Sequence, residues 1–353
     1  MQRFLIDPSQ PRLVSHVFYG GAHLFQAGVL AKMGVRALSS PEAALVSPKV
    51  LDKLRREPIE DYRIDFEDGF GYRSGAEEDD AATRAGIEFA RMALAGALPP
   101  RIGLRPKAEL KRASRTLDLF LKYANGGPLP KRLIVTQPKL QHPEEARRWR
   151  EMLEKAEAQF GLPSQTLRHE LMVEHPAAIH SLAEIARLCE NRLDSAHFGC
   201  YDYLSAMQVP APAQRLDHPY ATHARWAMLQ VMLPLGVSVS DGAYPQLPTG
   251  EDHAARRAAF EGHKAEVRRA LEQGLFCGWD LHPGQLLSRY SALYEFFDSS
   301  LGPVKARYRA FLDAETKALR AGAQFDDAAT AEGLLVFLRR GLSCGAFTPE
   351  DLQ

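Results

Sequence analysis

Three carboxylates crowd into the segment YRIDFEDGFGYRS at residues 62–74. Asp65, Glu67 and Asp68 end an apolar stretch, and glycines follow them. Carboxylates in such a position can bind a cation, hold a water molecule or exchange a proton. Because side chains alternate along a strand with period two, Asp65 and Glu67 share one face, while Asp68 lies where the chain turns. The segment predicts metal or acid–base chemistry, with Asp65 more suited to packing and hydrogen bonding than to catalysis.

Polar residues also end the other apolar runs of the chain. Glu174 and Asp202 supply carboxylates from two different runs, which suits Mg²⁺ because this ion takes oxygen ligands and leaves positions to water and substrate. Arg105 offers a planar guanidinium for a substrate carboxylate. Together these types suit the binding of a 2-oxo acid and the stabilisation of an enolate. The remaining polar residues at such ends are Lys107, Gln137, Lys139, His175, Asp241 and His282.

Eight short apolar runs alternate with longer segments of helical spacing. This alternation is typical of βα units and a parallel sheet. Eight strands are the number that a (β/α)8 TIM barrel needs, and the active site of such a barrel lies at the C-terminal ends of its strands. The strands are expected at residues 14–20, 62–68, 101–107, 132–139, 168–174, 195–202, 237–244 and 278–283.

Helix-start signals lie between these runs. Ser74 and Glu77 form an S-x-x-E capping box, and Pro143 and Pro176 each open a helical pattern. An additional helix at residues 41–54 makes the first connection longer than a minimal βα unit.

The strand signals stop after about residue 300. Residues 303–321 and 327–340 are expected to form two helices, ended by Gly322 and Gly341. We therefore expect a barrel domain and a C-terminal helical extension, with residues 1–300 and 301–353 as their bounds.

The composition argues against several classes of partner. The 44 Lys+Arg residues balance 44 Asp+Glu residues, so no nucleic-acid partner is indicated. The 4 cysteines show no C-x-x-C spacing, which favours a reduced protein without a disulfide framework. The N-terminus lacks the apolar run of a secretory signal, and no run is long enough to cross a membrane. We expect a soluble, cytoplasmic protein.

Seven motifs follow one another over roughly residues 14–290: D-F-E-D, R-P-K, P-K-L, V-E-H-P, H-F-G-C-Y-D-Y, V-S-D-G-A-Y and L-H-P-G-Q. In this order they resemble the HpcH/HpaI aldolase and citrate lyase beta-subunit family. The resemblance implies a (β/α)8 barrel and a homo-oligomer. It also implies a carbon–carbon lyase that uses Mg²⁺ or Mn²⁺ and acts through a metal-bound enolate of pyruvate, acetyl-CoA or a related acid.

The resemblance further implies roles for single residues. Glu174 and Asp202 match the family's metal ligands, and Arg105 matches its substrate-carboxylate arginine. Glu67 and Asp68 match the acidic pair that hydrogen-bonds metal-bound water and the substrate.

Departures from the family pattern bear on the substrate. Lys107 replaces an asparagine, His175 replaces a threonine, and Asp80 replaces a lysine that is often found in acyl-CoA members. His282 matches the histidine of the last strand. The changes favour a small 2-oxo or 2-hydroxy acid over a CoA thioester as substrate. An acyl-CoA lyase or thioesterase of the malyl-CoA or citramalyl-CoA type is the alternative, and a non-catalytic ligand-binding barrel is a third.

Each assignment has a structural alternative. Glu174 and Asp202 are also suited to capping the helices that follow them. Arg105 is equally suited to pairing with Asp65 or Glu67 inside the protein.

Other residues leave the mechanism open. Lys107 or Lys139 would form a Schiff base if desolvated, although the carboxylate pair favours a metal. The proton carrier is either a metal-bound water or His175, with His23 as a further candidate. Gly20 and Gly21 suit either a backbone anion site for the substrate or a tight turn. Cys200 is not expected to act as a nucleophile, because its context supplies no activating base.

Overall fold

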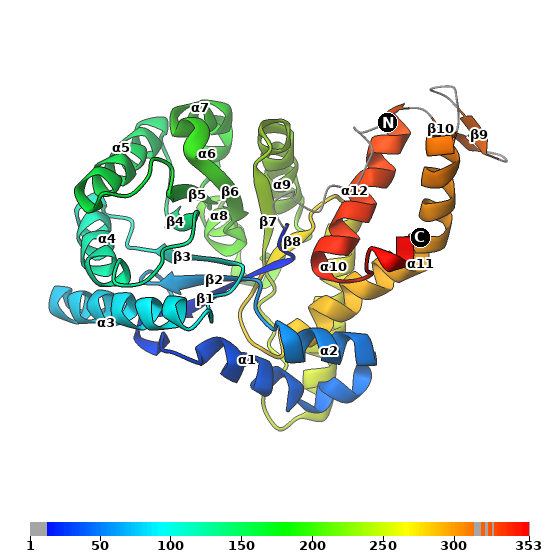
Figure 1. Ribbon diagram of the computed structural model, residues 1–353, viewed down its shortest axis with the longest axis horizontal. Helices are drawn as coiled ribbons and strands as arrows, with labels where there is room; N and C mark the ends of the chain where they lie inside the picture. The colour runs from blue at the N-terminus through cyan, green and yellow to red at the C-terminus, as the bar shows by residue number, and fades with distance from the viewer. Residues whose placement is uncertain (1–12, 314–318, 322–323, 327, 353) are drawn as a thin grey trace.

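Eight parallel strands close into a barrel in chain order (Figure 1). The computed structural model describes residues 13–313, 319–321, 324–326 and 328–352. The (β/α)8 TIM barrel expected from the sequence is confirmed, although most strands end two to four residues before the predicted limits, so the polar residues beyond them lie in loops or, for Asp202, in the helix that follows. The strands are β1 (His16–Gly21), β2 (Asp61–Asp65), β3 (Arg101–Arg105), β4 (Leu133–Gln137), β5 (Leu167–Val173), β6 (Leu193–Phe198), β7 (Ser238–Ala243) and β8 (Cys277–Asp280).

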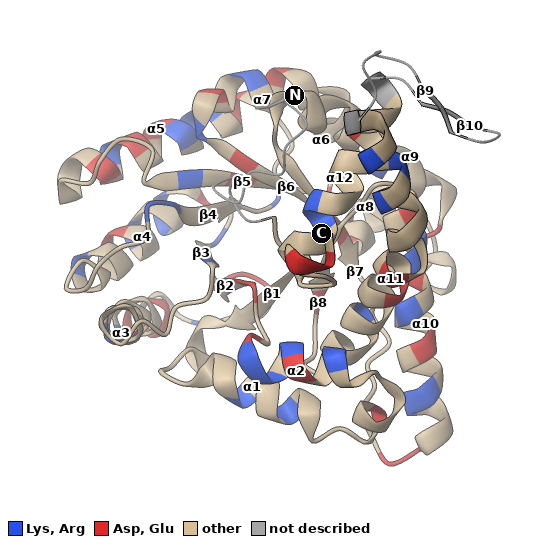
Figure 2. Cartoon of the chain, turned by 45° about the vertical axis from the view of Figure 1, so that its right-hand side comes forward, with Lys and Arg blue, Asp and Glu red and all other residues tan. Residues whose placement is uncertain are grey.

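Helices surround the barrel and cover the outer face of its strands (Figure 2). Buried apolar side chains of strands and helices form the core between the two layers. The helices are α1 (Val29–Leu38), α2 (Pro48–Arg56), α3 (Gly75–Leu94), α4 (Leu110–Ala124), α5 (Pro143–Phe160), α6 (Pro176–His180), α7 (Leu182–Cys189), α8 (Cys200–Ala206), α9 (Pro219–Met232), α10 (His253–Glu272), α11 (Gln285–Asp313) and α12 (Ala328–Cys344).

The helix starts follow the signals in the sequence. Ser74 and Glu77 form the expected capping box at the start of α3, and Pro143 occupies the first turn of α5. Pro176 opens only the short α6, because the chain breaks at Ser181 before α7. The first connection is long, as expected, and contains α1, a 3-10 turn at Pro41–Leu45 and α2.

The C-terminal part differs from the prediction. A single helix, α11, runs from Gln285 to Asp313, so the helix predicted at 303–321 begins earlier and ends earlier. Two short strands, β9 (Leu319–Ala321) and β10 (Gln324–Asp326), pair antiparallel after it. The predicted stop at Gly322 lies outside the described residues, and α12 continues past Gly341 to Cys344.

The α11–α12 pair extends away from the barrel (Figure 1). Phe297 of α11 anchors α12 through Phe337, at a ring-centroid distance of 4.9 Å, and also contacts Phe347. Residue 300 lies inside α11, so the division of the chain at that residue stays a proposal. The homo-oligomer also stays a prediction.

A charged layer fills the middle of the barrel. Glu170 of β5 receives hydrogen bonds from Arg63 of β2, with Nε at 2.9 Å from Oε1, and from Thr136 and Ser195 of the neighbouring strands. Strands β2 and β5 are not neighbours, so the Arg63–Glu170 pair crosses the interior. Burial raises the pKa of Glu170, but the charges and hydrogen bonds of Arg63 and His197 together outweigh burial and hold that pKa well below its usual value. Because its oxygens accept hydrogen bonds from β2, β4 and β6, the Glu170 carboxylate connects β5 to these three strands.

Further ionic layers lie on either side of this one. Asp61 and Arg101 form an ion pair with Nε 3.1 Å from Oδ2, and Asp194 of β6 pairs with the same arginine. Residues 61, 63 and 65 of β2 share one face because strand side chains alternate. The barrel interior is therefore a stack of ion pairs that ends, at the mouth, with Asp65.

Acid should destabilise the protein through its buried histidines. Burial lowers the pKa of His169 to about 3, and it also lowers the pKa of His16 and His263. The unfolded chain binds protons below pH ~6.5, so the stability from His169 is complete above that pH and is lost towards pH 3. We expect a loss of about 2 kcal/mol at pH 5 from His169, measured by urea unfolding against pH.

His169→Gln tests this expectation, since an amide can still bond Gln137, whose Oε1 lies 2.9 Å from the ring Nε2. The variant should show a shallower fall in stability between pH 6.5 and 5, whereas the exposed His223→Gln should keep the wild-type slope. An unchanged slope in His169→Gln would contradict the expectation.

Among the described residues, no helix is long and apolar enough to span a membrane.

Candidate active site

A clamp at the end of β2 holds Arg105. The guanidinium of Arg105 donates from Nε and Nη2 to the two carboxylate oxygens of Asp65 at 2.7 and 2.6 Å. Residues 65 and 105 face each other in the β2–β3 register, which makes this pairing geometrically natural. Asp65 also accepts backbone N–H bonds from Glu67 and Gly69. Asp65 is thus a positioning residue, as the sequence suggested, and it consumes two of the three guanidinium nitrogens.

The third nitrogen of Arg105 points to the rim. Nη1 is buried and has no hydrogen-bond partner among the described residues, although Asp68 Oδ2 lies 3.1 Å away. The aromatic rings of Tyr19 and Trp279 flank the guanidinium, with centroids 4.8 and 5.3 Å from Cζ. Nη1 therefore has an ion-pair partner at the exposed rim but no hydrogen bond in the described part of the chain, which leaves it able to bind an anionic ligand atom.

Glu67 and Asp68 differ in their surroundings. Asp68 is 55% exposed at the rim, whereas Glu67 is 14% exposed. Glu67 Oε2 is buried without a hydrogen bond in the described part of the chain, and the nearest cation is Lys107 at 3.6 Å. Burial raises the pKa of Glu67, although the Lys107 charge opposes the rise. A carboxylate with a raised pKa at a barrel mouth is suited to proton transfer.

Glu174 and Asp202 meet across a lysine. The Lys139 ammonium lies 3.5 Å from Glu174 Oε2 and 3.0 Å from Asp202 Oδ1. Glu174 is almost wholly buried, and Asp202 is 53% exposed at the first turn of α8. The structure thus brings together the two carboxylates that the sequence singled out as metal ligands.

Two carboxylates are a fitting protein contribution for Mg²⁺. No group of three or more His, Cys, Asp or Glu side chains converges as a metal cage in the part of the chain that the structure describes. Mg²⁺ is commonly held by one or two carboxylates, with water and substrate oxygens completing its octahedron. Because one cation, Lys139, already bridges the pair, the position suits positive charge. The donor set therefore fits Mg²⁺ or Mn²⁺, which Glu174 and Asp202 would hold.

The charges at this pair influence one another. Burial raises the pKa of Glu174, the Lys139 charge works against that rise, and Asp202 adds to it. For Lys139, burial lowers the pKa, but the carboxylates of Glu174 and Asp202 outweigh burial, so the pKa is raised. A lysine held in its charged form is a poor nucleophile for forming a Schiff base. The raised pKa of Lys139 therefore favours a metal-dependent mechanism over a Schiff-base mechanism.

Gly199 makes the room that Glu174 occupies. A Cβ at residue 199 would lie 2.5 Å from Glu174 Cβ and 2.9 Å from its Oε2. We expect Gly199→Ala to fold but to bind Mn²⁺ at least about tenfold more weakly, because Glu174 must move. Titration calorimetry with Mn²⁺ measures this, and Gly302→Ala, where a Cβ meets no atom within 4 Å, is the control. Equal Mn²⁺ affinity in Gly199→Ala and wild type would contradict the expectation.

The histidines take structural positions. His175 caps α6, with Nδ1 accepting the Ala177 N–H at 3.2 Å, which leaves only Nε2 for proton transfer. His282 accepts the Gly284 N–H through Nδ1 at 3.1 Å, and its Nε2 is buried without a partner among the described residues. Both rings lie next to the strand ends, and the proton-carrier role of His175 stays a prediction.

Gly20 and Gly21 are the last residues of β1 and pair with β2. A Cβ at Gly20 would lie 1.8 Å from the Tyr62 hydroxyl, and one at Gly21 would lie 2.3 Å from the Gly69 carbonyl oxygen. These close approaches favour a packing role over the substrate-binding role expected from the sequence. The helix that follows is a single 3-10 turn at Ala22–Leu24, so no long helix directs its N-terminus there.

An open hollow of about 540 Å³ adjoins Glu67 at the rim. Lys107 and Arg112 line it together with Tyr72 and Arg73, so the hollow has a basic wall. It provides room for a substrate beside the buried Glu67 carboxylate.

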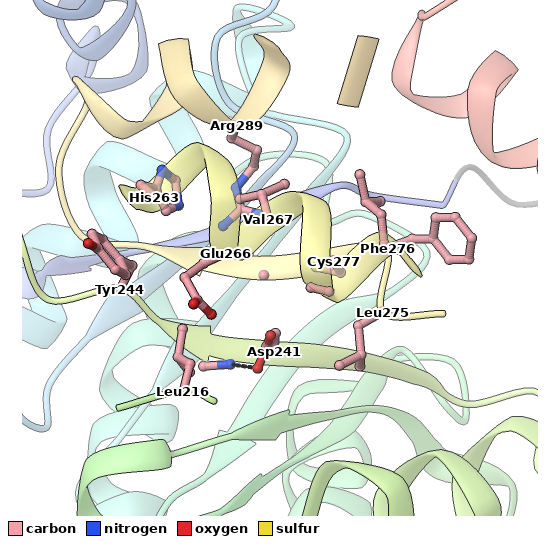
Figure 3. A pocket seen from close by; sticks show the side chains of 14 residues that line it. Leu216, Asp241, Tyr244, His263, Glu266, Val267, Leu275, Phe276, Cys277 and Arg289 are labelled. Carbon is pink, nitrogen blue, oxygen red and sulfur yellow. Dashed lines mark hydrogen bonds between the residues drawn. The ribbon is translucent and has the colours of Figure 1, made fainter. Parts of the chain in front are cut away.

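A second cavity lies between β7, β8 and α10 (Figure 3). Asp241 and Glu266 face one another in it, from β7 and α10. The charges around it are paired within the protein: Asp241 with Arg225, at 2.9 Å, and Arg289 with Asp280. This cavity therefore belongs to the packing of helix against barrel, and the strand-end groups carry the chemistry.

Two features of the site escaped the sequence reasoning. One is the place of Lys139 between the presumed metal ligands, for which its strand-end position was the available signal. The other is the aromatic pair Tyr19 and Trp279 around Arg105. Alternation in β1 places Tyr19 on the face opposite its neighbours Phe18 and Gly20, but only the closed barrel brings Trp279 beside it.

Proteins of known structure with this fold include enzymes that act on small organic acids. A citrate lyase from Burkholderia xenovorans LB400 aligns with a TM-score of 0.69 at 19% identity over 98% of both chains. A Haloferax volcanii malate synthase in a magnesium and glyoxylate complex gives 0.58 at 14% identity, over 85% of this chain and 92% of that one. CitE from Mycobacterium tuberculosis, in complex with magnesium, acetoacetate and coenzyme A, gives 0.56 at 18% over 92% and 97%. At these identities the likeness is one of fold.

The chain belongs to the family described as Domain of unknown function (DUF6986), whose model matches residues 7–353. The likeness to citrate lyases of the predicted family is supported at the level of fold, while the HpcH/HpaI name stays a prediction.

Several sequence relatives of known name are malate synthases. That of Oryza sativa subsp. japonica is 28% identical over 177 residues, which make up 47% of this chain and 30% of the relative. That of Streptomyces clavuligerus is 25% identical over 220 residues, covering 58% and 40%. The matched stretches span less than half of these enzymes.

Proposed function

We propose that the protein is a Mg²⁺-dependent enzyme that makes or breaks a carbon–carbon bond next to the carbonyl of a 2-oxo acid. The observation that carries the proposal is the grouping at one barrel mouth of the Glu174–Asp202 pair and of Arg105, whose Nη1 makes no hydrogen bond among the described residues. Burial raises the pKa of Glu174, and Arg105 is close enough for its charge to oppose that rise. The small acids glyoxylate and acetoacetate bound by the structural relatives are in keeping with this class of substrate.

The keto oxygen and the carboxylate of the substrate are bound by different groups of the site. When bound at Glu174 and Asp202, Mg²⁺ supplies a Lewis acid that polarises the keto oxygen. Arg105 takes one oxygen of the substrate carboxylate at Nη1, and Asp65 fixes the plane of the guanidinium while it does so.

Protons are handled at the acidic side of the mouth. Glu67 holds or releases a proton at its buried Oε2, and Asp68 orients water at the exposed rim. His175 Nε2 is the alternative proton carrier. Tyr19 and Trp279 shield Arg105 from water, which strengthens its interaction with a carboxylate.

Two versions of this function differ in the second reactant, which is either a free aldehyde or acid or an acyl-CoA. The departures from the family pattern, Asp80 and Lys107 among them, favour a free aldehyde or acid. The sequence similarity to malate synthases favours an acyl-CoA instead, and a Haloferax volcanii malate synthase of the same fold (TM-score 0.58, 16% identity, over 94% of this chain and 89% of that one) is known with pyruvate and acetyl-CoA.

A substrate screen tests the function and separates the versions. Purified protein with Mg²⁺ or Mn²⁺ is incubated with glyoxylate, pyruvate or oxaloacetate, each with aldehydes or with acetyl-CoA, and products are read by mass spectrometry and free thiol release. Product that requires both metal and 2-oxo acid supports the proposal, and thiol release assigns the acyl-CoA version. Binding without any product would identify a ligand-binding barrel instead.

A further inference from the structure

We infer that Lys139 is an exchangeable counter-cation of the proposed metal site: its ammonium competes with the divalent ion for Glu174 and Asp202 and thereby sets how tightly that ion binds. The inference rests on the proposed function, because it concerns the same two carboxylates. It assigns to Lys139 a role in metal affinity that is separate from the chemistry of the reaction.

One residue contacts both carboxylates in two different ways. The Lys139 backbone N–H donates to Glu174 Oε1 at 2.6 Å, and its ammonium faces Glu174 Oε2 at 3.5 Å and Asp202 Oδ1 at 3.0 Å. Oε1 is therefore committed to the backbone. The ammonium faces Oε2 and Oδ1, the oxygens that an ion shared by the two residues would need.

The backbone contact does not depend on the lysine side chain. Lys139 has a φ of 55°, in the left-handed region that few residues other than glycine adopt. The next residue, Leu140, is fully buried and anchors the turn. A strained conformation held by its surroundings is typical of functional positions, and here it aims the N–H at Glu174. A side-chain substitution therefore removes the ammonium and leaves the orientation of Glu174 in place.

The charges at the carboxylate pair determine whether Lys139 strengthens or weakens the binding of a divalent ion. Without a cation, two carboxylates that share one position repel each other, and burial increases the cost for Glu174. The ammonium relieves this repulsion. A divalent ion relieves it more strongly, but it must displace the ammonium from Oε2 and Oδ1, and the two cations repel each other if both remain. Lys139 therefore stabilises the carboxylate pair and weakens ion binding at the same time.

The displaced side chain has somewhere to go. Lys139 is 33% exposed, so its long stem can turn towards solvent without opening the core. The Asp68 carboxylate at the rim already contributes to the electrostatic field at Lys139. Asp68 is 55% exposed and offers the moved ammonium a new partner beside the substrate position.

The test compares Mn²⁺ binding in metal-stripped wild type and Lys139→Met by titration calorimetry and by the electron paramagnetic resonance signal of free Mn²⁺. Lys139→Met should lower the Mn²⁺ dissociation constant about tenfold or more. It should also lower the melting temperature without metal and enlarge the rise that Mn²⁺ produces. Lys139→Arg, which keeps a cation, should bind within about threefold of wild type, and Lys139→Gln replaces Lys139→Met if that variant precipitates.

Lys107→Met is the matched control. Lys107 is a second lysine of the same rim, but its ammonium faces the carbonyl oxygens of Glu67 and Gly71 at 3.2 and 3.3 Å. Its removal should change Mn²⁺ affinity less than about threefold. If the Mn²⁺ affinity of Lys107→Met also changed tenfold, the effect would come from the overall positive charge at the barrel mouth. This result would overturn the specific role of Lys139.

The outcomes separate this inference from the proposed function. If wild type binds Mn²⁺ and Lys139→Met binds it equally or more weakly, the counter-cation role is wrong while the metal site stands. If neither wild type nor Lys139→Met binds Mn²⁺, the metal site itself is wrong. Binding by Lys139→Met alone supports the inference, because it means that the lysine outcompetes the ion.

Discussion

Glu174→Gln is expected to abolish Mn²⁺ binding and to lower kcat/KM at least about 1000-fold on the 2-oxo acid that the enzyme uses. Glu174 is almost wholly buried and presents Oε2 towards Asp202 across Lys139. An amide has the shape of the carboxylate but lacks its charge, so the substitution removes half of the ionic ligand set without creating a cavity. Loss of a Lewis acid that stabilises developing negative charge costs several kcal/mol of barrier, and each factor of ten is about 1.4 kcal/mol.

The control for this result is Glu184→Gln on α7, whose side chain is 57% exposed and pairs with Arg187. This variant should bind Mn²⁺ and turn over substrate as the wild type does. Activity in metal-stripped Glu174→Gln above one tenth of the wild-type value would contradict a metal role for Glu174.

Glu170→Gln is expected to lower the free energy of unfolding by about 3 to 5 kcal/mol. The Glu170 carboxylate is fully buried and accepts from Arg63, Tyr19, Thr136 and Ser195. An amide cannot accept at its nitrogen, so donors that now converge on one oxygen would face another donor. Arg63 would also lose one of its two carboxylate partners while remaining buried.

Chemical denaturation at pH 7 measures this effect. Glu151→Gln on α5 is the matched control, because Glu151 pairs with Arg147 on the surface, where each side chain is more than one third exposed. An exposed pair contributes at most about 1 kcal/mol. A loss of less than 1 kcal/mol in Glu170→Gln would show that the charged barrel interior contributes little to stability.

The barrel itself was accessible from the sequence. All eight strands were placed, since short apolar runs between helical segments leave few other folds. The error lay at the strand ends: β6 stops at Phe198, for example, and Asp202 belongs to the first turn of α8. Periodicity locates a buried run, but the point at which the chain leaves the sheet depends on the loop that follows.

The ion pairs inside the barrel could not be predicted from the sequence in the same way. Arg63 and Glu170 lie more than 100 positions apart, and only barrel closure brings β2 opposite β5. A local signal existed, since charged residues recur at alternate positions 61, 63 and 65 of a buried strand. Their pairing with each other, and the sharing of Arg105 between Asp65 and the mouth, depends on registers that no single segment encodes.

The sequence indicated which residues lie at the barrel mouth, but it did not predict how those residues contact one another. Arg105 ends β3, and Glu174 and Asp202 follow β5 and β6 at the same mouth of the barrel, while their roles in the site stay predictions. The sequence left open whether Arg105 serves Asp65 or a substrate, and the structure shows Asp65 using two nitrogens while Nη1 has no hydrogen-bond partner among the described residues. The left-handed turn at Lys139 follows no glycine signal, so its contact with both carboxylates had to come from coordinates.

The most direct test is a crystal structure of the protein grown with Mg²⁺ and glyoxylate or oxaloacetate. We predict an ion within about 2.1 Å of one oxygen from each of Glu174 and Asp202, with the substrate carboxylate at Arg105 Nη1 and the Lys139 ammonium moved away from Oε2. An ion and acid bound elsewhere, or an acid bound at the mouth with Lys139 still bridging the two carboxylates, would contradict the account.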